Sequence, residues 1–314
     1  MVARALSDKQ ELHLIHLYRD CYVTTPALSK MYKVGQSTIV RIFRRRKIIC
    51  RKRPGHICYK CDEHFFDKID TEAKAYFFGL LFADGYNSWG KEGDKVDIVL
   101  KLQEKDKEIL IKFNKLINKD RPILIEQKRK VHWQDQHRVC INSKHMCQVL
   151  NSYGLIKRKS NVKKFPQIIL DSNEDIQRHF IRGYFDGNGY IGDTLHCGEF
   201  RLTLTSTNDM CDNFYEVVNK YLSLNFKKSI NKSNKLNDIN CYQLNVYNLI
   251  NVYAILNWMY KDSKYHIDRK YDKYLKIKKD YEKKVNLVTD SANTENSVAG
   301  CLCVTLWDNV GLEP

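Results

Sequence analysis

Two similar apolar segments, one in each half of the chain, constrain this sequence most. Residues 77–86 read FFGLLFADGY and residues 181–190 read IRGYFDGNGY. Each segment is typical of a buried helix that carries two small residues four positions apart on one face, namely Gly79 with Ala83 and Gly183 with Gly187. Because small residues at this spacing allow two helix backbones to approach closely, we expect the two helices to pack against each other.

The residues that follow each segment repeat as well. An alternating strand is expected at 96–103 and again at 200–207, and each strand is followed by a helical pattern, at 105–117 and 208–222. A second strand running into a helix is expected later in each half, at 138–155 and 241–260. We therefore predict an α+β fold of two pseudo-twofold halves, residues 71–165 and 166–284, with a tail of unknown role at 285–314.

The composition favours a polyanionic partner. Lys and Arg number 53 against 37 Asp and Glu, so the net charge is +16, and 43% of the residues are hydrophobic. A folded protein with such an excess of positive charge most often binds nucleic acid, although a basic enzyme with another substrate is the alternative. The 11 cysteines are scattered, which indicates free thiols in a reducing compartment. We find no membrane-spanning run or signal-peptide core, so we expect a cytoplasmic or nucleoid-associated protein that is not secreted.

Residues 1–48 have the pattern of a helix-turn-helix domain. Helices are expected within 7–20, 24–32 and 36–47, with Ser7 or Asp8 capping the first and Thr24 or Thr25 capping the second. In this motif the third helix enters the major groove of DNA, and the predicted base contacts are Gln36, Ser37, Thr38 and Arg41. A basic arm that suits the DNA backbone or minor groove follows, with Arg44, Arg45, Arg46, Arg51, Lys52 and Arg53. An ordinary three-helix bundle is the alternative.

A basic linker at 49–70 contains a Cys-x-x-Cys pair, Cys58 and Cys61, with histidines nearby. A zinc site usually needs a second pair of ligands at regular spacing, which this sequence lacks. We therefore interpret the two cysteines as free thiols and keep a zinc site as the alternative.

Asp84 and Asn188 stand at corresponding positions of the repeat, one residue before the glycines, Gly85 and Gly189, at which the helices are expected to end. If the helices pack together, the two residues emerge side by side. A carboxylate at the negative end of a helix dipole is unfavourable unless a cation shares the site. Asp84 and Asn188 are therefore candidate oxygen ligands of a divalent metal ion, and Mg²⁺ is the usual ion beside phosphates.

At these residues the sequence resembles the LAGLIDADG homing endonucleases, in the single-chain form with two motifs. The resemblance extends over residues 65–280 and includes GLIKRKS at 154–160 and YHIDRKYDKY at 265–274. An N-terminal helix-turn-helix is also found in this family. The resemblance implies two αββαββα halves whose curved antiparallel sheets form a saddle over duplex DNA. It also implies a metal-dependent endonuclease that hydrolyses one phosphodiester on each strand.

The resemblance further implies roles for individual residues. Asp84 and Asn188 would bind the metal and would form the catalytic centre together with Lys101, Lys159 and Lys270. For each lysine, the alternative is a phosphate clamp without a chemical role. Outward-facing residues of the sheets would read the major groove, and the basic candidates are Lys128, Arg129, Lys130, Arg138, Arg201, Lys227, Lys228 and Lys232. We expect a monomer encoded by a free-standing gene or an intron, since no intein splice signal is present.

Asn188 departs from the family pattern, which usually has Asp at this position. An amide offers an oxygen but lacks the negative charge that a hard dication needs. Three interpretations stay open: an engineered inactive form, a natural nickase or weakened enzyme, and a non-cleaving binder such as an intron-splicing RNA maturase. The helix-turn-helix favours DNA, because the major groove of an RNA helix is too narrow for a recognition helix. Asp186 is expected to support the helix pair rather than the chemistry.

Overall fold

The structure is a computed structural model that describes residues 6–20, 23–48, 60–90, 96–118, 121–126, 135–157, 162–193, 200–224, 230–232 and 240–294. Contacts within the chain divide it into two compact units, Met1–Cys58 and Tyr59–Pro314. Each unit has a hydrophobic core of its own.

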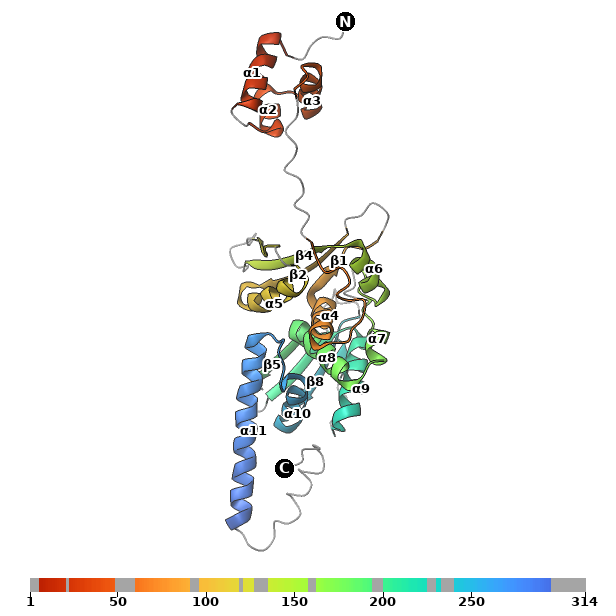
Figure 1. Cartoon of the computed structure of the whole chain (residues 1–314). Helices are drawn as coiled ribbons and strands as arrows, with labels where there is room; N and C mark the ends of the chain where they lie inside the picture. Colours follow the sequence, from red (N-terminus) through yellow and green to blue (C-terminus); the bar gives the residue numbers. More distant parts are fainter. Residues whose placement is uncertain are drawn as a thin grey trace. The chain divides into compact units, whose positions relative to one another are not determined.

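Three short helices form the first unit, α1 (Asp8–Arg19), α2 (Thr25–Tyr32) and α3 (Gln36–Arg45) (Figure 1). Helix α1 begins at a capping box in which the Ser7 side chain accepts a hydrogen bond from the backbone N–H of Gln10. Thr24 caps α2 in the same way. The helices close around buried side chains, which include Leu14, Leu28, Ile39 and Phe43. The predicted helices of the N-terminal segment are confirmed.

The second unit contains two runs of elements in a similar order. The first run is α4 (Glu72–Asp84), β1 (Gly85–Asn87), β2 (Asp97–Gln103), η1 (Glu104–Asp106), α5 (Lys107–Ile117), β3 (Leu124–Glu126), β4 (Gln136–Asn142) and α6 (Lys144–Ser152). The second run is α7 (Gln167–Leu170), α8 (Glu174–Asn188), β5 (Gly189–Asp193), β6 (Phe200–Ser206), α9 (Asn208–Leu222), β7 (Ile230–Lys232), β8 (Tyr242–Tyr247), α10 (Leu249–Tyr260) and α11 (Asp268–Thr294).

Each run forms a four-stranded antiparallel sheet. The strand orders are β1-β2-β4-β3 and β5-β6-β8-β7, so the two sheets have the same topology. Their registers correspond as well, since Gly85 pairs with Leu100 in the first sheet and Gly189 pairs with Leu204 in the second. The predicted α+β fold with antiparallel sheets is confirmed.

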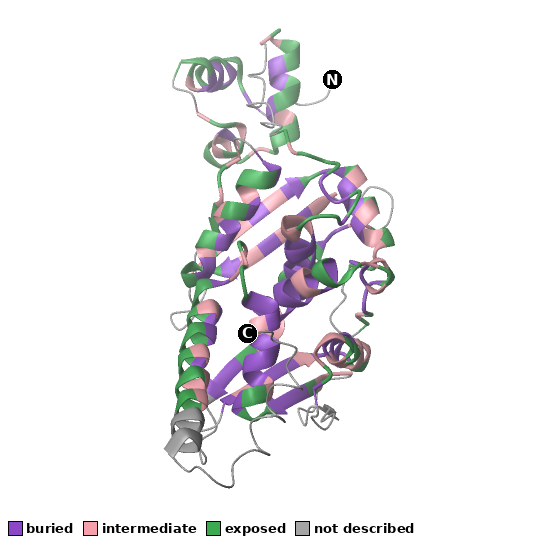
Figure 2. Cartoon of the chain, turned by 60° about the horizontal axis from the view of Figure 1, so that its bottom comes forward, coloured by how far each residue is buried: buried purple, intermediate pink, exposed green. Residues whose placement is uncertain are grey.

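Alternation along the strands gives each sheet a buried face and an outward face. In β2, Ile98, Leu100 and Leu102 are buried, and the residues between them are half-buried. Helices α5 and α6 contact the first sheet, and α9 and α10 contact the second. Figure 2 shows the buried positions gathered in the strands and in the helices between them. The half-buried positions of β2 therefore lie on the outward face of the first sheet.

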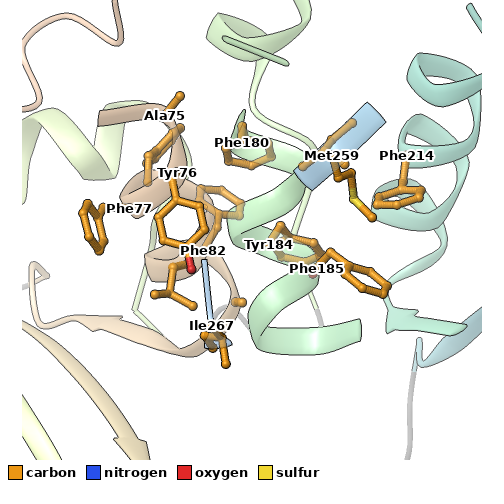
Figure 3. Packing of buried hydrophobic residues seen from close by; sticks show 14 of the residues in the cluster. Ala75, Tyr76, Phe77, Phe82, Phe180, Tyr184, Phe185, Phe214, Met259 and Ile267 are labelled. Carbon is orange, nitrogen blue, oxygen red and sulfur yellow. The ribbon is translucent and has the colours of Figure 1, made fainter. Parts of the chain in front are cut away.

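Helices α4 and α8 pack against each other within the second unit. The contact is at backbone level, because a Cβ built on Gly183 would lie 2.0 Å from the carbonyl oxygen of Tyr76. A Cβ on Gly79 would likewise lie 2.1 Å from the carbonyl oxygen of Phe180. Aromatic side chains, among them Tyr184, surround this contact (Figure 3). The two helices therefore touch along the faces that carry the small residues.

Both helices end at the expected glycines, but not in the left-handed conformation common at helix ends. Gly85 has φ −77° and ψ 162°, and Gly189 has φ −88° and ψ 158°, so both are extended. Strands β1 and β5 begin at these residues. Glycine is needed at position 85 because a Cβ there would lie 2.6 Å from the carbonyl oxygen of Leu81. Each helix thus passes directly into the first strand of its sheet.

Helix α11 continues past residue 284, where the second half was expected to end. It packs against α10 through stacked rings of Tyr253 and Tyr281, whose centroids are 4.1 Å apart. Residues 295–314 of the expected tail lie outside the described residues. Within the described part of the chain, no helix combines the length and the hydropathy needed to cross a membrane.

Candidate active site at the ends of two helices

The packing of α4 against α8 brings the corresponding positions of the repeat close together. Asp84 is the last residue of α4, and Asn188 is the last residue of α8. A Cβ built on Gly187 would lie 2.3 Å from the Cβ of Ala83 and 2.8 Å from Oδ2 of Asp84. The Asp84 carboxylate therefore lies against α8 one residue before Asn188. Asp84 is exposed and Asn188 is half-buried, so one carboxylate and one amide lie at the shared end of the two helices.

Lys270, in the first turn of α11, caps the end of α8. Its Nζ donates hydrogen bonds to the carbonyl oxygens of Phe185 (2.5 Å), Asp186 (2.8 Å) and Gly189 (2.6 Å). The side chain is 2% exposed, and this burial lowers the pKa of Lys270 to about 8, against the charges of Asp186 and Asp84. An ammonium group here offsets the negative end of the α8 dipole.

Lys163 makes the corresponding contact with α4. Its Nζ donates to the carbonyl oxygen of Ala83 at 3.3 Å. Burial lowers the pKa of Lys163 to about 8, and the Asp84 charge opposes that shift. Sequence reasoning selected Lys159, which lies outside the described residues, and missed Lys163. The separation of Lys163 from Asp84 resembles that of Lys270 from Asn188, but the adjacent Lys164 matches it equally well, so the sequence alone does not identify Lys163.

Tyr184 holds the Asn188 side chain. Its hydroxyl forms hydrogen bonds with the Asn188 side chain and with the Ser206 hydroxyl of β6. Burial raises the pKa of Tyr184, so the phenol stays neutral at physiological pH. Tyr184, one turn before Asn188 in α8, thus links the Asn188 side chain to strand β6 of the second sheet.

Asp186 is fully buried and has a structural role. Its carboxylate accepts hydrogen bonds from the hydroxyls of Tyr76 (2.7 Å) and Tyr260 (2.6 Å) and from the backbone N–H of Ile267 (2.9 Å). Tyr76 belongs to α4 and Tyr260 to α10, so Asp186 ties α8 to both helices. The expectation that it supports the helix pair is confirmed.

No protein-family model and no curated protein matches this chain. Solved structures are similar to it at low identity. Meganuclease I-SmaMI bound to uncleavable DNA is similar with a TM-score of 0.43 and 13% identity, over 67% of this chain and 90% of that chain. The LAGLIDADG homing endonuclease I-GzeII in complex with its DNA target is similar with a TM-score of 0.44 and 11% identity, over 71% of this chain and 93% of that chain. The N-terminal LAGLIDADG domain of DUF199/WhiA is similar with a TM-score of 0.39 and 14% identity, over 66% of this chain and 92% of that chain.

Lys101 lies on the outward face of the first sheet, where it is paired within the sheet. Its Nζ donates to Oε2 of Glu126 at 2.7 Å, and a guanidinium nitrogen of Arg138 lies 3.9 Å from the same oxygen. Lys101, a predicted catalytic residue, and Arg138, a predicted DNA contact, thus share one carboxylate in β3. Lys163 and Lys270, by contrast, bind the helix ends directly.

The outward face of the second sheet joins an aromatic ring to two cations. The Arg201 guanidinium lies 5.8 Å from the centroid of the exposed Tyr190 ring, and Nζ of Lys273 lies 5.2 Å from it. Lys232 belongs to β7, where only its backbone is described. Other predicted DNA contacts lie outside the described residues, namely Arg51, Lys52, Arg53, Lys128, Arg129, Lys130, Lys227 and Lys228.

Helix α3 presents an exposed stripe made by Gln36, Ser37, Val40, Arg41 and Arg44. Thr38 is half-buried and accepts a hydrogen bond from Arg41 at 3.2 Å. The other predicted basic residues of this helix end have partners inside the unit. Arg45 and Arg46 both donate to Glu11, which is 1% exposed, and Arg46 also donates to Asp8. These two arginines therefore hold α3 against α1.

The donors at the shared helix end fit a hard divalent ion in part. The Asp84 carboxylate and the Asn188 amide are oxygen donors of the kind that Mg²⁺ accepts. The ammonium groups of Lys163 and Lys270 already contact the carbonyls at the two helix ends. An ion at this place would therefore depend on Asp84 for charge and on water and phosphate oxygens for its other ligands.

Proposed function

We propose that this chain is a site-specific DNA-binding protein of the homing-endonuclease type, whose phosphodiester-cleaving centre is the shared end of α4 and α8. The convergence of Asp84, Lys163 and Lys270 at that end carries the proposal. The two halves, 71–165 and 166–284, would be related by an approximate twofold axis, as are the strands of a duplex. The chain would act as a monomer, with residues 1–48 as an added DNA-reading domain and 49–70 as the linker.

The chain's own residues would divide the work at this centre. Asp84, with the amide oxygen of Asn188, would hold the Mg²⁺ or another divalent ion, which when bound polarises the phosphate and lowers the pKa of a water molecule. The ammonium group of Lys163, close enough to Asp84 for its charge to be felt, would stabilise the charge that develops on the phosphate. Lys270, bound to three carbonyl oxygens, would position the end of α8.

Three surfaces would hold the DNA. Arg138 and Lys101 on the first sheet, Arg201 on the second sheet, and the exposed stripe of α3 offer cations and hydrogen-bond donors to phosphates and base edges. The net charge of +16 supplies the long-range attraction. We expect the affinity to fall steeply with salt, since each neutralised phosphate releases counterions.

A strand-resolved cleavage assay tests the proposal. A target would be selected from a randomised duplex library, labelled on each strand in turn, and incubated with Mg²⁺. We expect the parent chain to cut at most one strand, Asn188→Asp to cut both, and Asp84→Asn to cut neither while binding the target about as well as the parent. Asp171→Asn, which changes an exposed aspartate at the end of α7, is the matched control and should behave like the parent. Cleavage that survives Asp84→Asn would refute the assignment.

Asn188 favours one second candidate, a nucleic-acid binder that no longer cleaves, such as an RNA maturase. The same assay separates the two, because Asn188→Asp in a cleaving scaffold should regain activity. A variant that binds tightly and cuts neither strand with Mg²⁺ or Mn²⁺ would point to the binder. Competition by structured RNA against the selected duplex would then show which nucleic acid the surface prefers.

A further inference from the structure

Two histidines and an aspartate converge on the surface of the second unit, at a place that the proposed cleavage centre does not use. His64 Nδ1 lies 2.7 Å from Asp67 Oδ2, and His145 Nε2 lies 2.6 Å from Asp67 Oδ1. The two imidazole rings have centroids 4.6 Å apart. One donor atom from each of the three residues lies within 4.8 Å of the other two. Residues from two distant segments thus point at one spot.

The segment that carries His64 and Asp67 is held by the core of the second unit and by a backbone hydrogen bond. Phe65 and Phe66, which lie between them in sequence, are both buried in the core of the unit. The Tyr153 hydroxyl donates a hydrogen bond to the backbone carbonyl of Asp67 at 2.9 Å. The backbone positions of His64 and Asp67 are therefore set by packing and hydrogen bonding, without any help from an ion.

His145 belongs to a different element, helix α6. It lies in the first turn of α6, which begins where the Ser143 side chain accepts a hydrogen bond from the backbone N–H of Met146. Met146 and Cys147, next to His145 in the helix, are buried. The start of α6 is therefore fixed to the core, and the imidazole is presented to the segment at 62–67.

We propose that His64, Asp67 and His145 form a binding site for a transition-metal ion, Zn²⁺ in the first place, with water in the remaining position. Two imidazole nitrogens and one carboxylate oxygen are donors that zinc takes at about 2.0–2.2 Å. The imidazole–carboxylate distances of 2.7 and 2.6 Å are those of hydrogen bonds and are shorter than the separation of two ligands around one tetrahedral ion. Rotation of the partly exposed side chains on their fixed backbones would make room for the ion. Imidazole donors favour such an ion over Mg²⁺ or Ca²⁺.

The consequence of a bound ion would be a cross-link between the segment preceding α4 and the start of α6. Lys60 is the first described residue of the second unit, so this segment lies near the start of that unit in the sequence. An ion would therefore stabilise the N-terminal segment of the second unit. Its stabilising free energy grows with metal concentration as RT ln(1 + [L]/Kd).

Hydrogen bonds alone also explain two histidines beside one carboxylate, and pH distinguishes the two cases. The hydrogen bond to Asp67 raises the pKa of His64, and Glu63 and Asp62 add to this effect. The hydrogen-bonded cluster is strongest when the imidazoles are protonated. Metal binding requires neutral imidazoles, so the affinity for zinc should fall as the pH drops and protons compete with the ion.

The cysteines of the linker are a separate question. Cys61 forms a backbone bridge with Asn118, and burial raises the pKa of its thiol, which disfavours the thiolate that zinc needs. Cys58 lies outside the described residues. The proposed site contains no sulfur ligand. Spectroscopy distinguishes it from a cysteine site, because only a thiolate ligand gives an intense charge-transfer band.

Titration with Co²⁺ and competition by Zn²⁺ test the site on the full chain, prepared without a histidine tag. We expect one equivalent of Co²⁺ to bind with weak visible absorption bands and without the intense near-ultraviolet band of a thiolate ligand. Asp67→Asn and His145→Ala should each weaken binding by about 100-fold or more, since even the loss of a partner that only orients a ligand costs 10–100-fold. Cys61→Ser should leave binding unchanged.

His16→Ala is the matched control, because His16 also contacts a carboxylate, that of Asp20, at 2.7 Å, but the pair belongs to no group of three potential metal ligands in the described part of the chain. It should bind metal like the parent. Circular dichroism of each variant without metal shows whether it is folded, and Asp67→Asn keeps the shape of the cluster if His145→Ala does not fold. A thiolate band, the absence of saturable binding, or an unchanged affinity in Asp67→Asn would overturn the proposal.

Discussion

Replacing Gly183 by alanine tests the backbone contact on which the candidate active site depends. The added Cβ would lie 2.0 Å from the Tyr76 carbonyl oxygen, 2.9 Å from the Tyr76 carbonyl carbon and 3.1 Å from the Leu80 backbone nitrogen. Non-bonded carbon atoms sit at about 3.5–4.0 Å, so α4 and α8 would have to move apart by about 1 Å or more. The obstacle is backbone, which cannot rotate away as a side chain can.

The net effect is the difference of two terms. Alanine is about 1 kcal/mol more favourable than glycine inside a helix, which stabilises the variant. Overpacking of a filled core costs about 1–3 kcal/mol, and the upper end applies here because two helix backbones must separate. We therefore expect a loss of about 2 kcal/mol. In a unit of this size each kcal/mol lowers the Tm by about 2–4 °C, so the Tm should fall by about 4–8 °C.

Tryptophan fluorescence measures this change in the second unit alone. All four tryptophans, Trp89, Trp133, Trp258 and Trp307, follow residue 58, so the first unit does not contribute to the signal. Gly35→Ala, whose added Cβ would meet only ordinary contacts at 3.5 Å or more in the first unit, should leave the tryptophan signal unchanged and so checks that the signal reports the second unit alone. A Tm of Gly183→Ala equal to or above that of the parent would mean that the helices are not in backbone contact, and the assignment of Asp84 and Asn188 to one site would fall with it.

Three further predictions concern the lysine cap, the ion pairs of the first unit and the role of that unit. Because the pKa of Lys270 is lowered to about 8, the unfolded chain holds a proton that the folded chain has released between about pH 8 and 10.5, so this group makes stability rise with pH in that window. The free energy of unfolding of the parent minus that of Lys270→Met, from urea titrations, should therefore increase from pH 7 to pH 9.5, and a constant difference would contradict the buried lysine. Glu11→Gln should destabilise the first unit by about 1–3 kcal/mol, because Arg45 and Arg46 lose a buried partner, and hydrogen exchange of α1 to α3 would show it. Deleting residues 1–58 should weaken DNA binding and shorten the footprint at one end of the site, whereas an unchanged footprint would argue against a DNA-reading role.

Local patterns made much of the fold predictable from the sequence. The alternation in 96–103 and 200–207 reflects strands with one face on the core, and both strands are present. Helix α9 spans the whole predicted range of 208–222, since a Thr207 cap and a regular apolar face mark it. These elements depend on neighbours within a few residues, and so they can be read without the tertiary structure.

The residues that the sequence did not reveal depend on contacts between distant segments. Lys163 reaches Ala83, and His145 reaches Asp67, across long stretches of chain. The periodicity of the sequence does not predict such long-range contacts, because they depend on how whole elements pack together. The pairing of Arg45 and Arg46 with Glu11 has the same origin, and it gives two predicted DNA contacts a second role inside the first unit.

The two helix ends, although they correspond in sequence, differ in charge, and this difference bears on the proposed loss of cleavage. At the end of α4, the ammonium group of Lys163 faces the exposed carboxylate of Asp84, so the two charges nearly cancel. At the end of α8, Lys270 is held by three carbonyl oxygens while the amide of Asn188 carries no charge. A hard dication approaching the α8 end therefore meets a neutral, weaker ligand beside the Lys270 ammonium group. We expect the charge of residue 188, rather than its shape, to limit this end, so that Asn188→Asp restores what the nearly isosteric amide lacks.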